Sequence, residues 1–573
     1  MTTAFTPTFT THPARPVRAA LSGDMRIARA VGWVVTALLV VFIVCPLVAI
    51  LAQAVLDHDG HFDRFAQARA ILSDPRLIDS IAHSAYMALA TTALVIPLAF
   101  TFAFALCRTR IWARGPLKLL ALAPMLAPSL LPAISLVYLF GNQGPLKGWL
   151  GSYSLYGPIG IVLGEAFYTF PHALLVILSA LTLADARLYE AAETLGASRL
   201  RRLLTITLPQ AKYGLVSAAL LVFTLTITDF CVPVVVGGQY NVLALEAYKQ
   251  VIGQQHFGEG AVVGLMLLIP AVFAVVVERM LARSQAGALS GRSAIYVAKP
   301  NRLRDVLLWC TCVLISLCLL ALLGTAVVAS FIKLWPYSME FSLMHYDFDM
   351  VDGGGWLAFR NSIKLASYTA VIGCGMLFLT TYLLEKTPLP SVANRIIRAV
   401  AMLPMAVPGL VLGLGYIFFF NATRNPLHGL YGTLAILVIS TVAHYFSTGY
   451  MTLSTSLRQL DGEIEAVSAT LKRPWWHSCL HITLPVCLPT ILDVGRFMFV
   501  SAMSTVSCTI FLYTPDTVLA GVAVLNMDDA GDTAAAAAMA TLIVATSFAA
   551  TLVLNAIGWL LNRRAQRWRT SRT

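Results

Sequence analysis

Long apolar runs dominate the chain and set the first prediction. One run begins at Val31 and reads VGWVVTALLVVFIVCPLVAILAQAVL, and another begins at Leu307 and reads LLWCTCVLISLCLLALLGTAVVASFI. A helix needs about 20 apolar residues to cross the hydrocarbon core of a bilayer. These runs predict an all-α membrane protein, because a transmembrane β-barrel would show short segments of alternating polarity.

Applied along the whole chain, this window predicts about twelve transmembrane helices. They start near residues 30, 80, 117, 157, 213, 258, 305, 360, 397, 431, 487 and 533. Composition agrees with this prediction, since 58% of the 573 residues are hydrophobic and only 12% are charged. A soluble chain of this length would need more polar surface to cover its core.

The net charge of +12 could suggest a nucleic-acid partner, but the positions of the basic residues favour membrane topology. Basic residues gather between spans, at 108–118 and 291–305, and in both terminal segments. The positive-inside rule therefore predicts cytoplasmic N- and C-termini and contact with lipid headgroups. The first apolar run is too long for a signal-peptide core and reads as an uncleaved anchor.

The 10 cysteines show neither CxxC nor His/Cys ligand spacing. This pattern predicts small buried hydrophobic side chains instead of disulfides or a metal site.

Matching motifs recur in the same order in the two halves of the chain. Ile-Thr-Leu-Pro occurs at Ile206 and again at Ile482, and PMLAP at Pro124 returns as PMAVP at Pro404. Self-similarity of this kind indicates an internal repeat, here of two parallel six-helix halves around a translocation path. The predicted parts are a basic N-terminus (1–29), a first half (30–282), a basic linker (283–304), a second half (305–561) and a basic tail (562–573).

A polar segment of the first half shows a helical pattern. Leu188, Ala191, Ala192 and Leu195 fall at i, i+3, i+4 and i+7, which predicts one apolar face of a short helix. Gly196 is expected to end this helix with a positive φ. Proline disfavours helical geometry in the residue before it, so Pro209 is expected to mark a turn before the next span.

The second copy keeps the apolar face and changes the residues around it. The face becomes Ile464, Val467, Ser468 and Leu471. Lys472 stands where the first copy has glycine, and Pro474 is expected to replace the glycine as the stop. An exposed apolar helix could dock in the groove of a partner, or pack on the protein's own membrane helices, and the pattern leaves both open.

Both segments resemble the EAA loop of permease subunits of binding-protein-dependent ABC importers. The residues that carry the resemblance in the first copy are Glu190, Ala191, Ala192, Gly196, Ile206, Leu208 and Pro209. Those in the second copy are Glu465, Ala466, Leu471, Ile482, Leu484 and Pro485, with departures at the glycine and acidic positions. The resemblance implies a type I importer permease in a bacterial inner membrane, with these residues coupling it to a separate cytoplasmic ATPase.

The same resemblance implies two copies of that ATPase, which would bind ATP and magnesium, and a periplasmic solute-binding protein. The chain itself has no GxxxxGK[ST] motif to hold nucleotide phosphates, so we expect no bound cofactor and no enzymatic activity of its own.

Charged and polar residues inside predicted spans are candidates for the translocation path, because burying them in a bilayer is costly. The candidates are Glu165, Asp229, His444, Asp493 and Arg496. Asp493 and Arg496, at i and i+3, could instead pair with each other. Asp229 could be a gate or an interfacial cap, and Glu165 and His444 could simply be satisfied by neighbouring helices.

Two polar segments on the predicted outer side, 237–260 and 513–540, occupy matching places in the halves. They could receive a binding protein, line the outer mouth, or form ordinary solvated loops. Their sequences NVLALEAYKQVIGQQ and VAVLNMDDAGDTAAAAAMA are similar to the fused permeases of 2-aminoethylphosphonate importers. This resemblance implies 2-aminoethylphosphonate as the substrate. Fused permeases also serve ferric iron, thiamine and polyamines, which are the alternatives.

Two other functional classes remain to be weighed. A secondary carrier with six-plus-six repeats would leave the paired loops unexplained, and carboxylates for a coupling ion are scarce at mid-span. An intramembrane enzyme would need a catalytic constellation, and none stands out in the sequence.

Overall fold

The computed structural model describes residues 23–55, 73–182, 186–288, 298, 300–351 and 353–565. Within these ranges, ten helices are long and apolar enough to cross a membrane, and two bent pairs bring the number to 12 if each pair is one span. The pairs bend by 102° (Arg114–Leu126 with Leu130–Phe140) and by 116° (Ser391–Ala406 with Gly409–Phe420). The prediction of an all-α membrane protein is therefore confirmed, and the spans predicted near 117 and 397 are the bent ones.

The elements follow each other in chain order. The first half contains α1 (Gly23–Leu39), η1 (Val40–Val44), α2 (Cys45–Val55), α4 (Pro75–Arg108), α5 (Arg114–Leu122), η2 (Ala123–Leu126), α6 (Leu130–Phe140), η3 (Lys147–Leu150), α7 (Pro158–Thr182), α8 (Ala186–Thr194), α9 (Arg199–Arg202), η4 (Leu203–Thr207), α10 (Leu208–Thr228), α11 (Cys231–Val236), α12 (Leu243–Tyr248), η5 (Lys249–Gly253) and α13 (Phe257–Ala288). The second half contains α14 (Arg302–Ser330), β1 (Ile332–Leu334), β2 (Ser338–Phe341), η6 (Met344–Tyr346), η7 (Phe348–Met350), α15 (Gly355–Lys386), α16 (Ser391–Met402), η8 (Leu403–Ala406), α17 (Gly409–Phe420), η9 (His428–Leu430), α18 (Leu434–Arg458), α19 (Glu463–Thr470), α20 (Trp475–Ser478), η10 (Cys479–Thr483), α21 (Leu484–Met503), η11 (Pro515–Thr517), α22 (Ala520–Asp529) and α23 (Thr533–Ala565).

The two halves repeat the same helix arrangement. The starts of α7 and α18 are as far apart along the chain as the starts of α10 and α21. The two Ile-Thr-Leu-Pro motifs have the same separation. Helix α7 packs against α4 and α10, and α18 packs in the same way against α15 and α21. The spacing read from the sequence motifs is therefore the spacing of the structural repeat.

Proline-containing motifs produce both bends. In PMLAP, Ala127 has an extended conformation (φ −94°, ψ 144°), and in PMAVP Val407 does the same (φ −112°, ψ 115°). A residue that precedes proline is pushed out of the α region by the proline ring, so the helix stops there. A new helix, α6 or α17, starts just beyond each motif.

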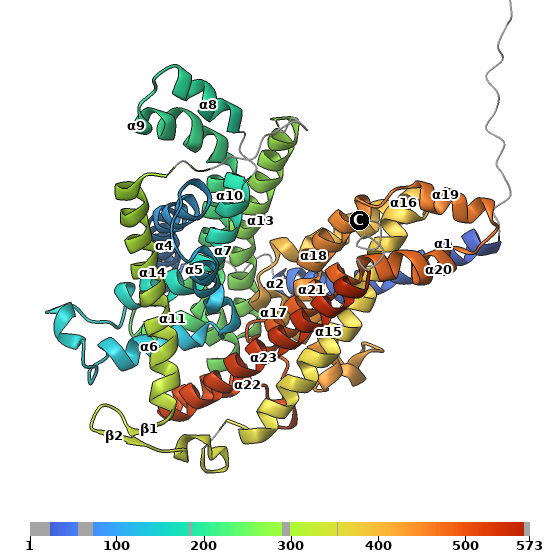
Figure 1. The fold of residues 1–573 in the computed structure, drawn as a ribbon. Helices are drawn as coiled ribbons and strands as arrows, with labels where there is room; N and C mark the ends of the chain where they lie inside the picture. Colours follow the sequence, from blue (N-terminus) through green and yellow to red (C-terminus); the bar gives the residue numbers. More distant parts are fainter. Residues whose placement is uncertain are drawn as a thin grey trace, which may run out of the picture.

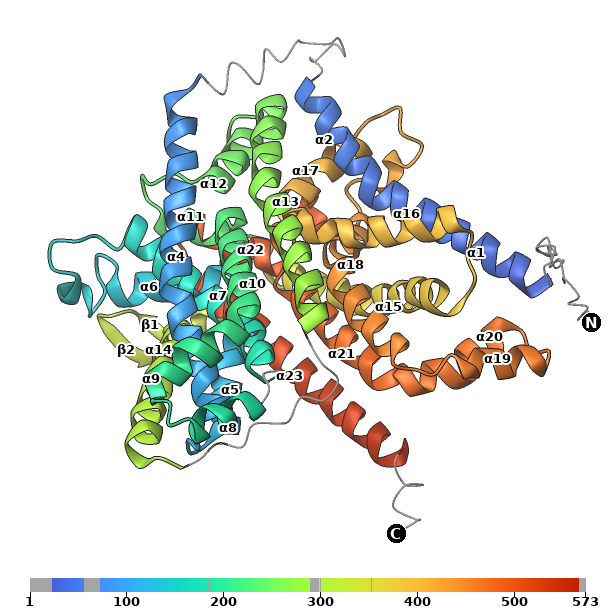
Figure 2. The same ribbon diagram turned by 90° about the horizontal axis from the view of Figure 1, so that it is seen from above.

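The first helix of each half packs against the other half. Helix α1 contacts α16 and α2 contacts α17, whereas α14 contacts α4, α5 and α6. Figures 1 and 2 show α1 and α2 (blue) among the yellow and orange helices, and α14 (yellow-green) beside the blue and cyan helices. The two halves are therefore interlocked instead of standing side by side.

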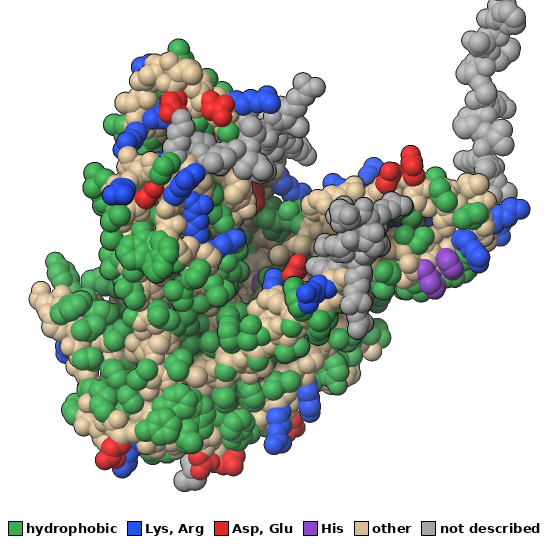
Figure 3. Space-filling view, in the orientation of Figure 1, with side chains coloured by type: hydrophobic (Ala, Val, Ile, Leu, Met, Phe, Trp, Pro, Cys, Tyr) green, Lys and Arg blue, Asp and Glu red, His purple; other side chains and the backbone are tan. Residues whose placement is uncertain are grey.

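Hydrophobic side chains cover much of the molecule's middle, and charged side chains gather towards its edges (Figure 3). A recess lies between the part of the molecule that carries α8 and α9 and the part that carries α19 and α20 (Figures 1 and 3). This distribution fits a chain whose middle is solvated by lipid. The short antiparallel hairpin β1–β2 follows α14 and lies at the opposite edge of the molecule (Figure 1).

Several predicted segments lie mainly or partly outside the described residues. They are 1–22 of the basic N-terminus, 289–297 and 299 of the linker, and 566–573 of the tail. The cytoplasmic placement of these segments stays a prediction.

Candidate functional site

The first EAA-like loop is a helix, a glycine turn and a second helix. Gly196 follows α8 with φ +68°, as predicted. The amide of Ala197 donates to the carbonyl of Ala192 at 2.9 Å, and that of Gly196 donates to Glu193 at 3.0 Å. This paired geometry satisfies the last carbonyls of α8 and fixes the direction of the chain. Ser198 then caps α9 by accepting from the amide of Arg201.

The apolar side chains of this loop are exposed. Leu188 is 51% exposed and Leu195 is 85% exposed, and Leu200 and Leu204 are exposed as well. Glu190 and Ala191 are also exposed, whereas Tyr189 turns inward and is buried. The alternative that this apolar face packs on the protein's own membrane helices is therefore wrong, and the face is available to a partner.

The predicted turn at Pro209 is wrong. Helix α9, η4 and α10 form one continuous helical segment, Arg199–Thr228, with Pro209 in its interior. The π-helical turn η4 precedes the proline, with the amide of Leu208 bonding to the carbonyl of Leu203. The wider turn accommodates a residue that lacks an N–H donor. The same arrangement recurs in the second half, where η10 precedes Pro485.

The second loop has the same shape with different chemistry. Lys472 adopts the left-handed conformation itself, with φ +53°, and the amide of Arg473 bonds to the carbonyl of Ser468 at 3.0 Å. The prediction that Pro474 replaces the glycine stop is wrong, because Pro474 is instead the residue before α20. Backbone hydrogen bonds at the end of α19 hold a lysine in a conformation that normally favours glycine.

Exposure in the second loop divides its predicted residues into two groups. Ala466 is exposed, as are Leu471 (68%) and Ile482 (38%). Glu465 is different, because its carboxylate pairs with Lys386 of α15 at 3.5 Å and its side chain is only 22% exposed. The acidic residue of this loop therefore faces its own chain. At the loop ends, Ile206, Leu208 and Leu484 are half-buried, and Pro209 and Pro485 are exposed.

Two of the predicted path residues come together inside the first half. Glu165 of α7 is fully buried, and neither of its carboxyl oxygens has a hydrogen-bond donor among the described residues. Its carboxyl lies close enough to Asp229 for the two to interact electrostatically. Asp229 accepts from the amide of Val232 in the first turn of the short helix α11, at 2.9 Å.

His444 brings the second half to the same region. Its imidazole lies over Gly409, where an added Cβ would be 3.1 Å from the ring, and its Nδ1 has no hydrogen-bond partner among the described residues. The ring packs edge-on against Tyr445, with centroids 4.6 Å apart. Tyr445 lies near Tyr168, which is one turn beyond Glu165 on α7. Polar side chains of α7 and α18 therefore lie in the same region of the molecule.

The sequence missed Tyr168 and Tyr445 because aromatic residues in an apolar span look like ordinary core. Their positions could have identified them, since Tyr168 lies at i+3 from Glu165, on the same helix face, and Tyr445 is adjacent to His444.

Asp493 and Arg496 do not join this cluster through any contact described. They form an ion pair at 3.2 Å, and Arg496 also donates to Asn555 of α23 at 2.6 Å. The alternative that these two residues pair with each other is confirmed.

The two outer segments are not solvated loops. Helix α22 is largely buried, with Leu525 and Met527 fully enclosed, and α12 packs against α13. Burial, together with the neighbouring Asp529, raises the pKa of Asp528 to about 6. Burial and the proximity of Asp529 raise the pKa of Tyr248, at the end of α12, to about 12. The two segments thus approach each other between the halves.

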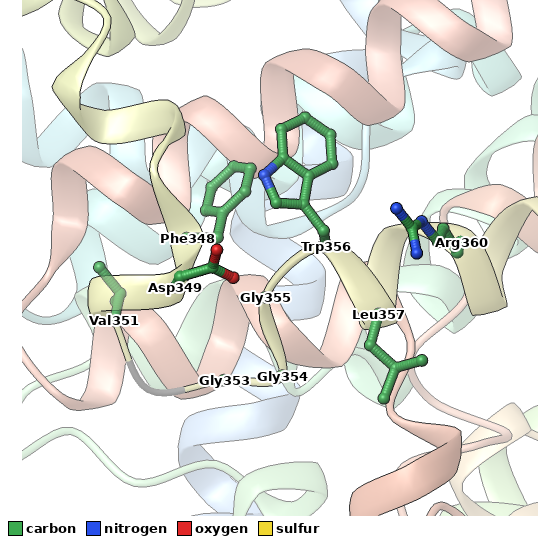
Figure 4. A pocket seen from close by; sticks show the side chains of 9 residues that line it. All are labelled: Phe348, Asp349, Val351, Gly353, Gly354, Gly355, Trp356, Leu357 and Arg360. Carbon is green, nitrogen blue, oxygen red and sulfur yellow. The ribbon is translucent and has the colours of Figure 1, made fainter.

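An open hollow lies beside the start of α15. Asp349, Trp356 and Arg360 are among its lining residues (Figure 4). Gly353 and Gly354 also line it and have positive φ, and an added Cβ on Gly354 would lie 3.1 Å from Val518. The hollow therefore belongs to the contact between α15 and the segment that leads to α22. Among the described residues, no group of three or more His, Cys, Asp or Glu could hold a metal ion.

Known proteins similar to this chain share its membrane character. Residues 95–287 match the family described as "Binding-protein-dependent transport system inner membrane component". The chain is 27% identical to a ferric transport system permease protein FbpB of Actinobacillus pleuropneumoniae, over 89% of this chain and 75% of that protein. It is 28% identical to a putative ferric transport system permease protein FbpB 1 of Haemophilus influenzae, over 83% and 76%.

A shorter similarity covers one part of the chain. A putative 2-aminoethylphosphonate transport system permease protein PhnV of Salmonella choleraesuis is 26% identical over 38% of this chain and 81% of that protein. The fold and these similarities agree on the class of protein: the chain is a multi-pass, all-α membrane protein that is similar to permease subunits of binding-protein-dependent transport systems, and these relatives are transport subunits and not enzymes.

Proposed function

We propose that the chain forms the translocation path of an ATP-driven importer and is moved by a separate ATPase through α8 and α19. The observation that carries this proposal is the exposure of apolar residues at matching places in both loops, Leu195 (85%) in the first and Leu471 (68%) in the second. The first loop also exposes Leu188, Leu200 and Leu204, and the second also exposes Val467, and apolar side chains that are exposed as a group mark an interaction site. Helix-in-groove docking of each loop would bury them.

The proposed partners follow from this arrangement. Two copies of a cytoplasmic ATPase, which bind ATP and magnesium, would receive the two loops, and a periplasmic binding protein would deliver cargo to the opposite face. Glu190, Ala191 and Ala192 then lie at the first docking surface, and Ala466 and Leu471 lie at the second. The membrane is the bacterial inner membrane, with both termini of the chain on the ATPase side.

The polar cluster between the halves is the proposed path. It comprises Glu165, Tyr168, Asp229, His444 and Tyr445, which supply carboxylate, phenol and imidazole groups. Arg496, the cation predicted for the path, is bound to Asp493 and Asn555. The cluster therefore suits a positively charged cargo better than an anionic one, because an anion would meet two carboxyl groups there.

We propose ferric iron as that cargo. Ferric permeases are similar to this chain over 83% and 89% of its length, and oxygen ligands suit a hard cation. A second candidate is 2-aminoethylphosphonate, which is supported by the similarity to PhnV over 38% of the chain. Its ammonium group could meet Glu165 and Asp229, but its phosphonate would need basic groups elsewhere along the path.

Uptake measurements test the importer role and the cargo together. Cells that lack the chain, and cells in which it is restored, are given radiolabelled ferric iron or labelled 2-aminoethylphosphonate at matched concentrations. Ferric uptake that depends on the chain supports the proposal. Uptake of the phosphonate alone would overturn the ferric assignment, and chain-independent uptake of both would overturn the two cargo assignments.

A docking variant tests the ATPase contact separately. Leu195→Asp places a charge on the exposed face of the first loop and should reduce co-purification of the ATPase and transport together. The matched control is Tyr337→Asp on the hairpin β1–β2, since Tyr337 is also exposed (71%) but lies at the opposite edge. Equal ATPase recovery with the wild type and Leu195→Asp would contradict the docking assignment.

A further inference from the structure

A buried cation ends the equivalent helix in each half. Arg108 is the last residue of α4, and Lys386 is the last residue of α15. Their separation along the chain is close to that of the two Ile-Thr-Leu-Pro motifs. Arg108 is 3% exposed, and the side chain of Lys386 is 6% exposed. Buried cations need partners, because desolvation of a charge is otherwise costly.

Arg108 connects α4 with two elements of the first loop region. Its guanidinium donates to the carbonyl oxygen of Leu181, near the end of α7, at 2.9 Å. The same guanidinium lies over the ring of Tyr189 in α8, 4.7 Å from the ring centroid. Tyr189 is buried, and its hydroxyl donates to Thr207 at 2.9 Å. A desolvated cation–π contact of this kind attracts the two side chains to each other.

Lys386 makes the same pair of connections in the second half. Its ammonium group donates to the carbonyl oxygen of Leu460, just beyond α18, at 2.9 Å. It also pairs with the carboxylate of Glu465 in α19, at 3.5 Å. Tyr189 and Glu465 have the same separation along the chain as the two Ile-Thr-Leu-Pro motifs, so the two loop partners occupy equivalent positions. The arrangement is the same in both halves, but a carboxylate replaces an aromatic ring.

Side-chain contacts link α8 and α19 to the membrane-spanning helices. Among the described elements, the extensive contacts of α19 are with α20, and α8 has no extensive contact with a membrane-spanning helix. The neighbouring Glu385 extends the connection in the second half, since it binds Arg398 of α16 at 2.9 Å and Arg458 of α18 at 3.0 Å. A displacement of α19 would therefore act on α15, α16 and α18 together.

We propose that Arg108–Tyr189 and Lys386–Glu465 are two equivalent struts, which transmit the movement of the ATPase-bound loops to α4 and α15. This inference rests on the proposed function, in which α8 and α19 dock on the ATPase. The four residues are positioning residues: they lie behind the docking surface and touch neither the ATPase nor the cargo. Their loss should uncouple ATP hydrolysis from transport while the ATPase stays bound.

A charge exchange tests the second strut in the complex of full-length chain, ATPase and binding protein, reconstituted in liposomes. Lys386→Glu and Glu465→Lys each place like charges together, and the double variant restores an attractive pair. We expect each single variant to lower cargo transported per ATP hydrolysed by about fivefold or more, with ATPase recovery unchanged. The double variant should return to within about twofold of the wild type.

Two further variants keep the test decisive if charge reversal prevents assembly. Glu465→Gln removes the ion pair without repulsion and should also uncouple. In the first half, Tyr189→Phe keeps the ring beneath Arg108 and should couple almost normally, whereas Tyr189→Leu should not. The matched control is charge exchange at Lys333 and Glu340, an exposed ion pair at 3.3 Å on the hairpin, which should change nothing.

The outcomes separate the strut from the proposed function. If the wild-type chain recovers no ATPase, the proposed function fails. If the ATPase binds but the single variants transport normally, or the double variant fails to recover, the strut is overturned. If Glu465→Gln abolishes ATPase binding, Glu465 is a docking residue, which also overturns the strut.

Discussion

Tyr416 of α17 donates a hydrogen bond to the carbonyl oxygen of Phe42 in η1, at 2.6 Å, and so joins the two halves of the chain. Tyr416 is fully buried. Beside it, Gly415 lies so close to the first span that an added Cβ would be 2.6 Å from the carbonyl oxygen of Pro46. The first span of the first half is therefore held by polar and backbone contacts within the second half.

Tyr416→Phe tests this connection. The ring still fills its site, but the carbonyl of Phe42 loses its donor, so we expect a loss of about 1 kcal/mol in stability. Thermal unfolding of the detergent-purified protein should show a lower midpoint. Tyr337→Phe, at an exposed tyrosine of the hairpin, is the control and should leave the midpoint unchanged. Equal midpoints for both variants would contradict the role given to Tyr416.

Most of the fold could be predicted from the sequence, because bilayer thickness fixes the length of an apolar span. The interlocking of the halves could not, since it depends on contacts between residues far apart, such as Tyr416 with Phe42 and Trp335 with the carbonyl of Tyr138. No local pattern encodes such pairs. The bends at 124–128 and 404–408 were within reach, because their prolines interrupt helices by a local mechanism.

The loops show where local rules are sufficient and where tertiary contacts override them. Gly196 takes the positive φ that its position requires, as the sequence predicts. Lys472 takes the same conformation although lysine does not favour it, because the hydrogen bonds that end α19 impose it. The role of Glu465 was also hidden, since only the fold brings Lys386 to it.

Close packing of α7 and α10 gives a second prediction. An added Cβ on Gly214 would lie 2.3 Å from the Cβ of Ala180, so the two helices must separate to admit it. We expect Gly214→Ala to destabilise the protein by about 1–3 kcal/mol. Gly324→Ala in α14 is the matched control, because no neighbouring atom of the described residues lies within 4 Å of its added Cβ. That control should be neutral or gain up to about 1 kcal/mol of helix propensity. Thermal unfolding measures both effects, and equal melting temperatures for Gly214→Ala and Gly324→Ala would contradict the prediction.

The two loop turns should respond to substitution with opposite signs. Gly196→Ala places a side chain at φ +68° and should cost about 1 kcal/mol, whereas Lys472→Gly relieves the strain at φ +53° and should gain a similar amount. Hydrogen exchange of the α8 and α19 amides measures both effects locally. Faster exchange in α8 and slower exchange in α19 are expected. Changes of the same sign in both loops would show that the turn conformation does not control loop stability.

Asp528 should make stability depend on pH. Burial and Asp529 raise its pKa from 3.8 to about 6, so the folded protein binds this proton more tightly than the unfolded chain does. The stabilisation that the folded protein gains from protonated Asp528 is fully present below about pH 4 and is lost as the pH rises through about 6. At neutral pH the buried charge costs at most about 3 kcal/mol, since one pKa unit corresponds to about 1.4 kcal/mol.

Asp528→Asn replaces the titratable carboxyl by an amide, which neither binds this proton nor carries a negative charge. The variant should be more stable than the wild type at pH 7.5, and the difference should shrink as the pH falls from about 6 to 4. Asp529→Asn is the matched variant: it removes only the neighbouring charge, so the transition should remain but move to lower pH. Melting temperatures recorded across pH 4–8 for the three proteins measure this directly. A wild-type curve parallel to that of Asp528→Asn would contradict the prediction. It would mean that the Asp528 carboxyl is as well solvated in the folded protein as in the unfolded chain.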